Sequence, residues 1–122
     1  MKYTIHVHGD YAEAVTSGDV NLVDGKACID EVFNICRQHE LSNVLVNGLQ
    51  LSEDVTVGTR FVVGEYLATH APSRMRVAIL VSTKLANESK ALQNTANNRG
   101  AQVITTDSLP DAMAFLGMAL PG

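Results

Sequence analysis

The chain has 122 residues, a common size for one domain, and its 46% hydrophobic and 18% charged residues are ordinary values for a globular protein. These values exclude a disordered or fibrous chain, and a net charge of −4 without any cluster of Lys and Arg argues against binding to nucleic acid or to an anionic membrane surface. We expect one domain over residues 1–122 in the cytoplasm, because the N-terminal residues alternate between apolar and polar and form no signal peptide or membrane span.

The first predicted elements form a β-hairpin. Residues 3–8 alternate with period two between apolar and polar side chains, which predicts a half-buried strand. Gly9-Asp10 is typical of a turn, and residues 11–16 predict the partner strand.

Helices and strands alternate in the rest of the chain. Asp24 is predicted to cap a helix over 25–40, and Ser52, followed by two acids, to cap a helix over 53–70. The other predicted elements are strands at 43–48, 76–81 and 101–105, and helices at 85–99 and from Ser108 to a stop at Gly117. This order predicts an α/β fold: a mixed, mostly parallel sheet with an N-terminal hairpin and about four helices packed mainly on one face.

The two cysteines, Cys28 and Cys36, lie on the first predicted helix. Eight residues separate them by about 12 Å along a helix axis, which is too far for a disulfide. Both fall within the apolar stripe of that helix, so we expect them to be small core residues in a reducing compartment.

Three stretches of the sequence resemble the central part of a STAS domain, the SpoIIAA-like domain of anti-sigma factor antagonists. They are Ser42-Asn43-Val44-Leu45-Val46-Asn47, Gly58 with Val62-Val63-Gly64-Glu65-Tyr66, and residues 75–82. The resemblance covers residues 16–116 and is one of pattern, spacing and element order. It implies the STAS fold.

The resemblance also bears on regulation. Anti-sigma factor antagonists carry Asp-Ser-Ser-Gly before their second helix, and a partner kinase phosphorylates the second Ser. Alignment on Gly58 and Gly64 puts Val57 at that position. Because valine has no hydroxyl, the resemblance implies a module without this phosphoserine switch. Thr56 is the alternative phosphoacceptor, although a β-branched residue between two valines favours capping or packing.

The end of the sequence resembles a variant branch of the same fold. Residues 111–116 (Asp-Ala-Met-Ala-Phe-Leu) are similar to the ending of STAS/SEC14-like proteins, which also lack the serine and are similar in shape to lipid-carrying domains. This branch implies an alternative function as a carrier or sensor of a small apolar or lipid-like ligand.

The predicted helix over 53–70 is more apolar than one buried face requires. Its apolar residues cover an arc of about 200°, against the ~100° that one buried face needs. Another helix of the chain, a dimer partner or an apolar ligand could cover the rest. Gly58 and Gly64 within it serve either helix-on-sheet packing or a flat patch for another backbone or a ligand.

Metal binding and catalysis have little support in the sequence. His6 and His8 share one strand face with Asp10 close behind, but no spacing brings His39 or His70 near them, so we expect a solvated sheet face and no metal. Capping and turn formation explain the acidic residues at predicted helix starts and turns. Without a catalytic, phosphate-loop or zinc motif, we expect no cofactor and no enzymatic activity.

The sequence therefore favours a non-catalytic protein-interaction or regulatory module of STAS type. We expect it to act through the helix over 53–70 and the loop over 47–52, with a homodimer as the simplest assembly, or another protein as partner. In the alternative function, a small apolar ligand lies between that helix and the sheet. The predicted interaction or ligand surface consists of Asn47, Leu49, Ser52, Val57, Gly58, Phe61 and Gly64.

Overall fold

The computed structural model describes residues 1–90, 93–94, 97 and 100–120, and its strands form one mixed sheet in the order β1-β2-β3-β4-β5. The strands are β1 (Lys2–His8), β2 (Tyr11–Gly18), β3 (Asn43–Leu51), β4 (Arg76–Leu80) and β5 (Gln102–Thr106). β1 pairs with β2 in antiparallel orientation, and the other neighbours are parallel. The predicted hairpin and the mostly parallel sheet are confirmed.

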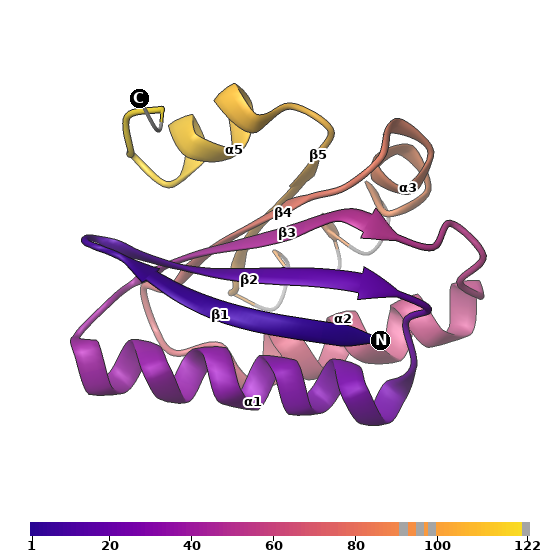
Figure 1. Cartoon of the computed structure of the whole chain (residues 1–122), viewed down its shortest axis with the longest axis horizontal. Coiled ribbons are helices and arrows are strands. Elements are labelled where there is room, and N and C mark those ends of the chain that lie inside the picture. The colour runs from indigo at the N-terminus through magenta and orange to yellow at the C-terminus, as the bar shows by residue number, and fades with distance from the viewer. Residues whose placement is uncertain (91–92, 95–96, 98–99, 121–122) are drawn as a thin grey trace.

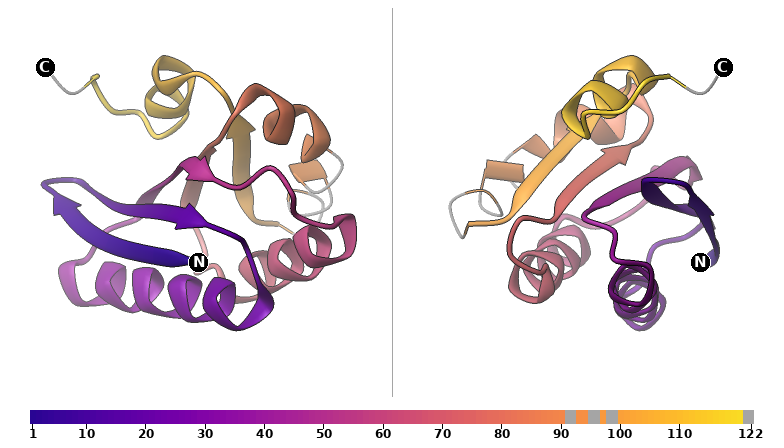
Figure 2. Two further views of the ribbon diagram at one scale, coloured as in Figure 1. Left: turned by 45° about the vertical axis from the view of Figure 1, so that its right-hand side comes forward. Right: turned by 90° about the vertical axis from the view of Figure 1, so that its left-hand side faces the viewer.

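The helices lie on both faces of this sheet. They are α1 (Leu22–His39), α2 (Val57–His70), α3 (Thr83–Glu88) and α5 (Leu109–Phe115). α1 and α2 run side by side along one face, α5 lies over the opposite face, and α3 follows the C-terminal end of β4 (Figures 1 and 2). The predicted α/β class with its mixed sheet is confirmed, and the two longest described helices, α1 and α2, share one face as predicted, while α5 covers the other.

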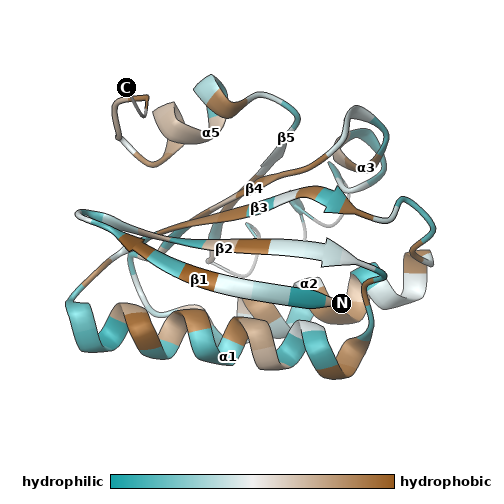
Figure 3. Cartoon of the chain, viewed as in Figure 1, coloured by the Kyte–Doolittle hydropathy of each residue, from teal (hydrophilic) through white to brown (hydrophobic). Residues whose placement is uncertain are grey.

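The alternation of side chains along the strands divides the core into two layers. Val44 and Val77 face α1 and α2, whereas Leu45 and Ala78 point to the other face and pack with α5. Figure 3 shows β3 and β4 as largely hydrophobic and α1 as a mixture of hydrophobic and hydrophilic residues. Strands buried on both faces need such continuous apolar runs, as predicted for β3.

α1 begins earlier than predicted. Its N-cap is Asn21, whose side chain accepts a hydrogen bond from the backbone N–H of Asp24 at 2.9 Å. Asp24 is therefore not the cap. Its carboxylate lies 3.1 Å from the N-terminal amine of Met1 and ties the start of β1 to α1.

The largest correction concerns the start of α2. The predicted helix from residue 53 with Ser52 as its cap is wrong, because β3 continues to Leu51 and the N–H of Ser52 still donates to the carbonyl of Gly18 at 2.9 Å. α2 begins at Val57 and is capped by Thr56, which accepts from the N–H of Thr59 at 3.1 Å. Thr56, which was expected to cap or to pack, thus caps α2, and the acids at 53–54 lie in the preceding loop.

The C-terminal elements follow the predicted order. α3 starts at Thr83, two residues before the predicted start, with Ser82 as its N-cap. Residues 91–92, 95–96 and 98–99 of the predicted helix over 85–99 lie outside the described residues. Ser108 caps α5 as predicted, and Gly117 follows the helix with a φ of 71°.

Candidate functional site

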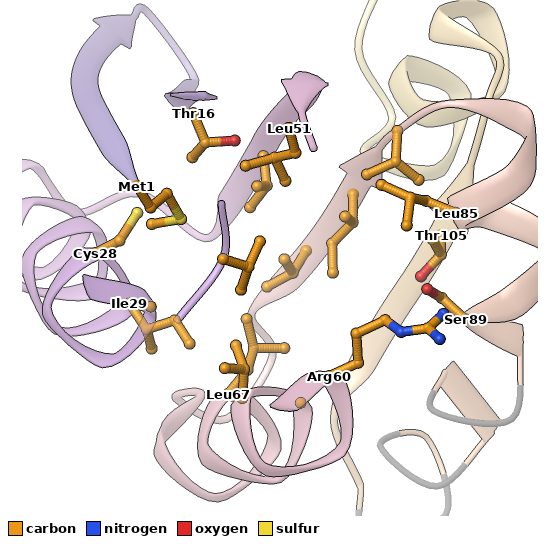
Figure 4. A pocket seen from close by; sticks show the side chains of 18 of the residues that line it. Met1, Thr16, Cys28, Ile29, Leu51, Arg60, Leu67, Leu85, Ser89 and Thr105 are labelled. Atoms are coloured by element: carbon orange, nitrogen blue, oxygen red, sulfur yellow. The ribbon is translucent and has the colours of Figure 1, made fainter. Parts of the chain in front are cut away.

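A cavity of about 160 Å³ lies between the sheet and the helices α1 and α2, and it extends toward α3 (Figure 4). Its walls are almost entirely apolar. The sheet contributes Val44, Val46, Val77 and Ile79, and the helices contribute Cys28, Ile29, Val63 and Leu67. The cavity is thus a partly open space that reaches into the core between the same layers that hold the fold together.

Small residues on the two helices explain why this space is not filled. Gly25 and Cys28 of α1 and Gly64 of α2 line the cavity and carry little or no side chain. At Gly25 the helices come close together, since a Cβ built there would lie 3.2 Å from a methyl group of Val63. The helices therefore pack against each other beside the cavity, while short side chains leave it open.

The polar groups of the cavity gather at its α3 end. Arg60 of α2 extends toward Ser89 and Thr105 (Figure 4). The Nη1 atom of Arg60 lies 3.2 Å from a carboxylate oxygen of Glu88, which makes an ion pair. Nε and Nη1 are both buried. Nη1 has this ion pair, and Nε makes no hydrogen bond with a residue that the structure describes. The cavity therefore has an apolar body and one cationic end.

The outer side of α2 is apolar and open. Val57 is 74% exposed, Phe61 44% and Val62 38%. α2 begins beyond the N-terminal end of α1, so α1 does not cover these first turns (Figures 1 and 2). We call Val57, Phe61 and Val62 the α2 surface.

The structure separates the residues of the predicted interaction surface. Val57 and Phe61 belong to the α2 surface, and Leu49 is exposed at the end of β3. Gly64 is buried and lines the cavity between α2 and the sheet, away from the α2 surface. Gly58 is exposed, and a Cβ built on it meets nothing within 4 Å, so the expected close approach is not present there.

The remaining two residues of that surface lie in polar surroundings. The amide of Asn47 donates to Glu13 at 3.2 Å, and its oxygen accepts from the N–H of Leu49 at 3.4 Å. Ser52 accepts from the N–H of Asp54 at 3.2 Å and so shapes the loop between β3 and α2. Neither residue lines the cavity.

The histidines of β1 lie on the exposed sheet surface. His8 contacts Glu13 at 2.8 Å and stacks on Tyr11, and His6 lies 3.3 Å from the hydroxyl of Thr4. Across the described part of the chain, His, Cys, Asp and Glu nowhere form a group of three that could hold a metal.

Both cysteines are buried in the core, as predicted. Burial raises the pKa of the Cys28 thiol to about 11, and burial likewise raises the pKa of Cys36 to about 11. Both side chains are therefore neutral thiols at physiological pH. None of the described helices has the length and hydropathy to cross a membrane.

The sequence does not predict the cavity or its cationic end. One signal was present: Arg60 is the single basic residue in the apolar segment between Val55 and Leu67. An arginine within an apolar helix face indicates either a buried ion pair or a polar ligand contact. Its partner Glu88 lies on another element and could not be identified from spacing.

No family model and no curated protein matches the chain. Two solved structures are similar in fold. An anti-sigma factor antagonist from Mycobacterium paratuberculosis superposes with a TM-score of 0.65 at 9% identity, covering 95% of this chain and 93% of the other. An uncharacterized protein of the DUF3478 family with a SpoIIAA-like fold, from Shewanella loihica, has a TM-score of 0.58 at 16% identity and covers 94% and 92%. With its mixed sheet and its helix order, this chain therefore has the SpoIIAA-like fold of STAS domains, as its sequence predicts.

Proposed function

We propose that this chain is a non-catalytic, cytoplasmic regulatory module that acts by protein contact through the α2 surface. The exposure of Val57, Phe61 and Val62 supports this proposal most directly. Val57 and Phe61 are four residues apart and share one helix face, so their exposed areas adjoin. Contiguous exposed apolar side chains on a soluble domain are typical of an interaction site.

The start of α1 extends the apolar area. Leu22 and Val23 are exposed in the first turn of α1, and a Cβ built on Gly25, one turn later, would lie 3.2 Å from a methyl group of Val63 of α2. The exposed apolar residues of the two helices therefore lie on neighbouring elements. A partner could contact both.

The proposed contact does not depend on phosphorylation at residue 57. Val57 occupies the position of the phosphoacceptor in the resemblance to anti-sigma factor antagonists, and it has no hydroxyl. The hydroxyl of Thr56, the alternative acceptor, is engaged within the helix cap: it accepts from the N–H of Thr59 and donates to the Thr59 hydroxyl at 2.9 Å. We therefore propose an apolar contact surface that is available without modification.

The partner we propose is a second copy of this chain. An apolar patch that contains no charge can meet its own copy across a two-fold axis without repulsion. The α2 surface is small beside the roughly 800 Å² per partner of a standard interface, so we expect a dissociation constant in the micromolar range or weaker.

Molar-mass measurement over a concentration series from micromolar to millimolar tests this proposal. We expect Phe61→Asp and Val57→Asp to remain monomeric and folded where the unmodified chain dimerises. Leu120→Asp is the matched control, because Leu120 is 53% exposed but lies outside α2, and it should dimerise normally. A chain that is monomeric throughout, or dimers that survive both α2 substitutions, would contradict the proposal.

A second candidate function is the carriage or sensing of a small apolar ligand. The cavity between α2 and the sheet favours it, because it lies where the alternative derived from the sequence places the ligand. This second function does not require the α2 surface.

A further inference from the structure

We propose that the cavity binds one small apolar molecule that carries a neutral hydrogen-bond acceptor, such as a carbonyl oxygen, at one end. Its apolar body would lie against the valines of β3 and β4, and its acceptor would meet Arg60. This inference rests on the carrier function of the cavity and is independent of the α2 surface.

The size of the cavity is the first reason. Protein interiors are packed as densely as organic crystals and contain few voids larger than a water molecule. A cavity of about 160 Å³ is several times the roughly 30 Å³ that one water occupies in the liquid. It matches in scale an engineered core cavity of about 150 Å³ in another protein, which binds benzene.

The chemistry of the walls determines the body of the ligand. Val44, Val77 and Ile79 present only hydrocarbon side chains from the sheet, and Leu67 and Val63 do the same from α2. A water molecule needs two to four polar partners to be held inside a protein, and this part of the cavity provides none. An apolar molecule would instead be stabilised there by removal of its surface from water.

Arg60 determines the end group. Its side chain is only 14% exposed, its Nη1 has the ion pair with Glu88, and its Nε donor makes no hydrogen bond with any residue in the described ranges. A buried donor without an acceptor is costly, and an acceptor atom on a ligand would remove that cost. The hydroxyls of Ser89 and Thr105 lie at the same end (Figure 4).

Glu88 determines the charge of that end group. Its carboxylate lies 3.2 Å from Nη1 of Arg60 and already balances the guanidinium charge. A second anion at this end would therefore face a nearby carboxylate and gain little from Arg60. A neutral acceptor fits the site better than a carboxylate.

Titrations followed by ¹H–¹⁵N NMR of the full chain test the proposal. The probes are hexan-2-one, which has a carbonyl, toluene, which has no comparable acceptor, and hexanoate, which is an anion. We expect hexan-2-one to shift the amide signals of Gly25 and Gly64 and to bind about 3- to 10-fold more tightly than toluene, the gain of one hydrogen bond. Hexanoate should bind more weakly than hexan-2-one.

Two variants separate the parts of the site. Arg60→Met keeps an apolar stem without donors, so it should bind toluene normally and lose the preference for hexan-2-one. Glu88→Gln leaves the guanidinium without its counter-charge, so hexanoate affinity should rise by about tenfold or more, and this variant serves if Arg60→Met does not fold.

Four results would overturn the inference: no shift at Gly25 and Gly64 with any probe, equal affinity for hexan-2-one and toluene, a preference that persists in Arg60→Met, or tighter binding of hexanoate than of hexan-2-one to the unmodified chain. Phe61→Asp is the control for the other proposal. This variant should lose dimerisation but bind hexan-2-one normally, so the failure of one proposal can be distinguished from the failure of the other.

Discussion

Replacing Val77 by isoleucine is expected to stabilise the chain, because residue 77 is buried in β4 and faces the cavity. Isoleucine keeps the β-branched shape that suits a strand and adds one methyl group. At about 24 cal/mol per Å³, a cavity of about 160 Å³ costs at most about 4 kcal/mol when empty. One added methyl group fills a fraction of it, and burial of one such group contributes about 0.8 kcal/mol. We therefore expect an increase of about 0.5–0.8 kcal/mol in the free energy of unfolding.

Val103→Ile is the matched control. Val103 is the parallel-strand register partner of Val77, and it is buried in the same core cluster without lining the cavity. Because Val103 does not face the cavity, we expect the same added methyl group to overpack the core and to lower the free energy of unfolding by about 1–3 kcal/mol. Urea unfolding followed by circular dichroism measures the free energy of unfolding of both variants. The two values can be compared if the m-values are equal. If Val77→Ile destabilises the chain as much as Val103→Ile, the cavity is not present in solution and the reasoning fails.

Three further predictions concern the loop before α2, the glycines and the cysteines. Thr56→Ala should lower the free energy of unfolding by about 1 kcal/mol, because it removes the cap of α2. Ser52→Ala should lower it by less than about half of that. The opposite ranking would mean that Ser52 is the cap. Gly58→Ala should stabilise the chain by about 0.5–1 kcal/mol, because its Cβ meets open space in a helix. Gly48→Ala should destabilise the chain, because its Cβ would lie 2.8 Å from a methyl group of Leu51. Thermal unfolding of both variants tests this ranking. The two buried thiols ionise at about 11 in the folded chain and near 9.0 when exposed, so their contribution to the free energy of unfolding should be constant well below pH 9 and fall between about pH 9 and 11. Urea titrations across this range should show the fall, and substitution of both cysteines by alanine should reduce it.

The sequence predicted the fold well because the main signals are local. The period-two alternation at residues 3–8 specifies a strand with one buried face, and the apolar run at 43–48 specifies a strand buried on both. Ser108, with an acid three residues later, specifies a helix start from a few adjacent residues. These features do not depend on distant parts of the chain.

The start of α2 was misplaced because two segments have the same local signature. Ser52 followed by two acids has the composition of a helix N-terminus, and so does Thr56. Long-range hydrogen bonds distinguish them: the N–H of Ser52 reaches Gly18 on β2, and Glu53 accepts from the hydroxyl of Ser82 at 2.7 Å. Such contacts hold residues 52–53 outside the helix, and they depend on the assembled sheet.

The cavity could not be predicted for a similar reason. Its volume results from short side chains at Gly25, Cys28 and Gly64, which lie on two helices and meet only after both pack on the sheet. What the sequence did indicate is that α2 has more apolar surface than one face can use. It left open whether a helix, a second chain or a ligand covers the excess.

The structure divides that excess between two sides of α2. Val63 and Leu67 face α1 and the cavity, whereas Val57 and Phe61 are exposed on the outside. Changes at independent sites are additive within about 0.5 kcal/mol. If the two sides act independently, Val77→Ile should therefore change the dimer dissociation constant by less than about twofold. Phe61→Asp should likewise change the affinity for hexan-2-one by less than about twofold. A larger change in the dimer dissociation constant of Val77→Ile, or in the ligand affinity of Phe61→Asp, would mean that α2 has two positions with different affinities for ligand and partner. In that case the ligand would regulate the contact, and the two proposals would describe one function.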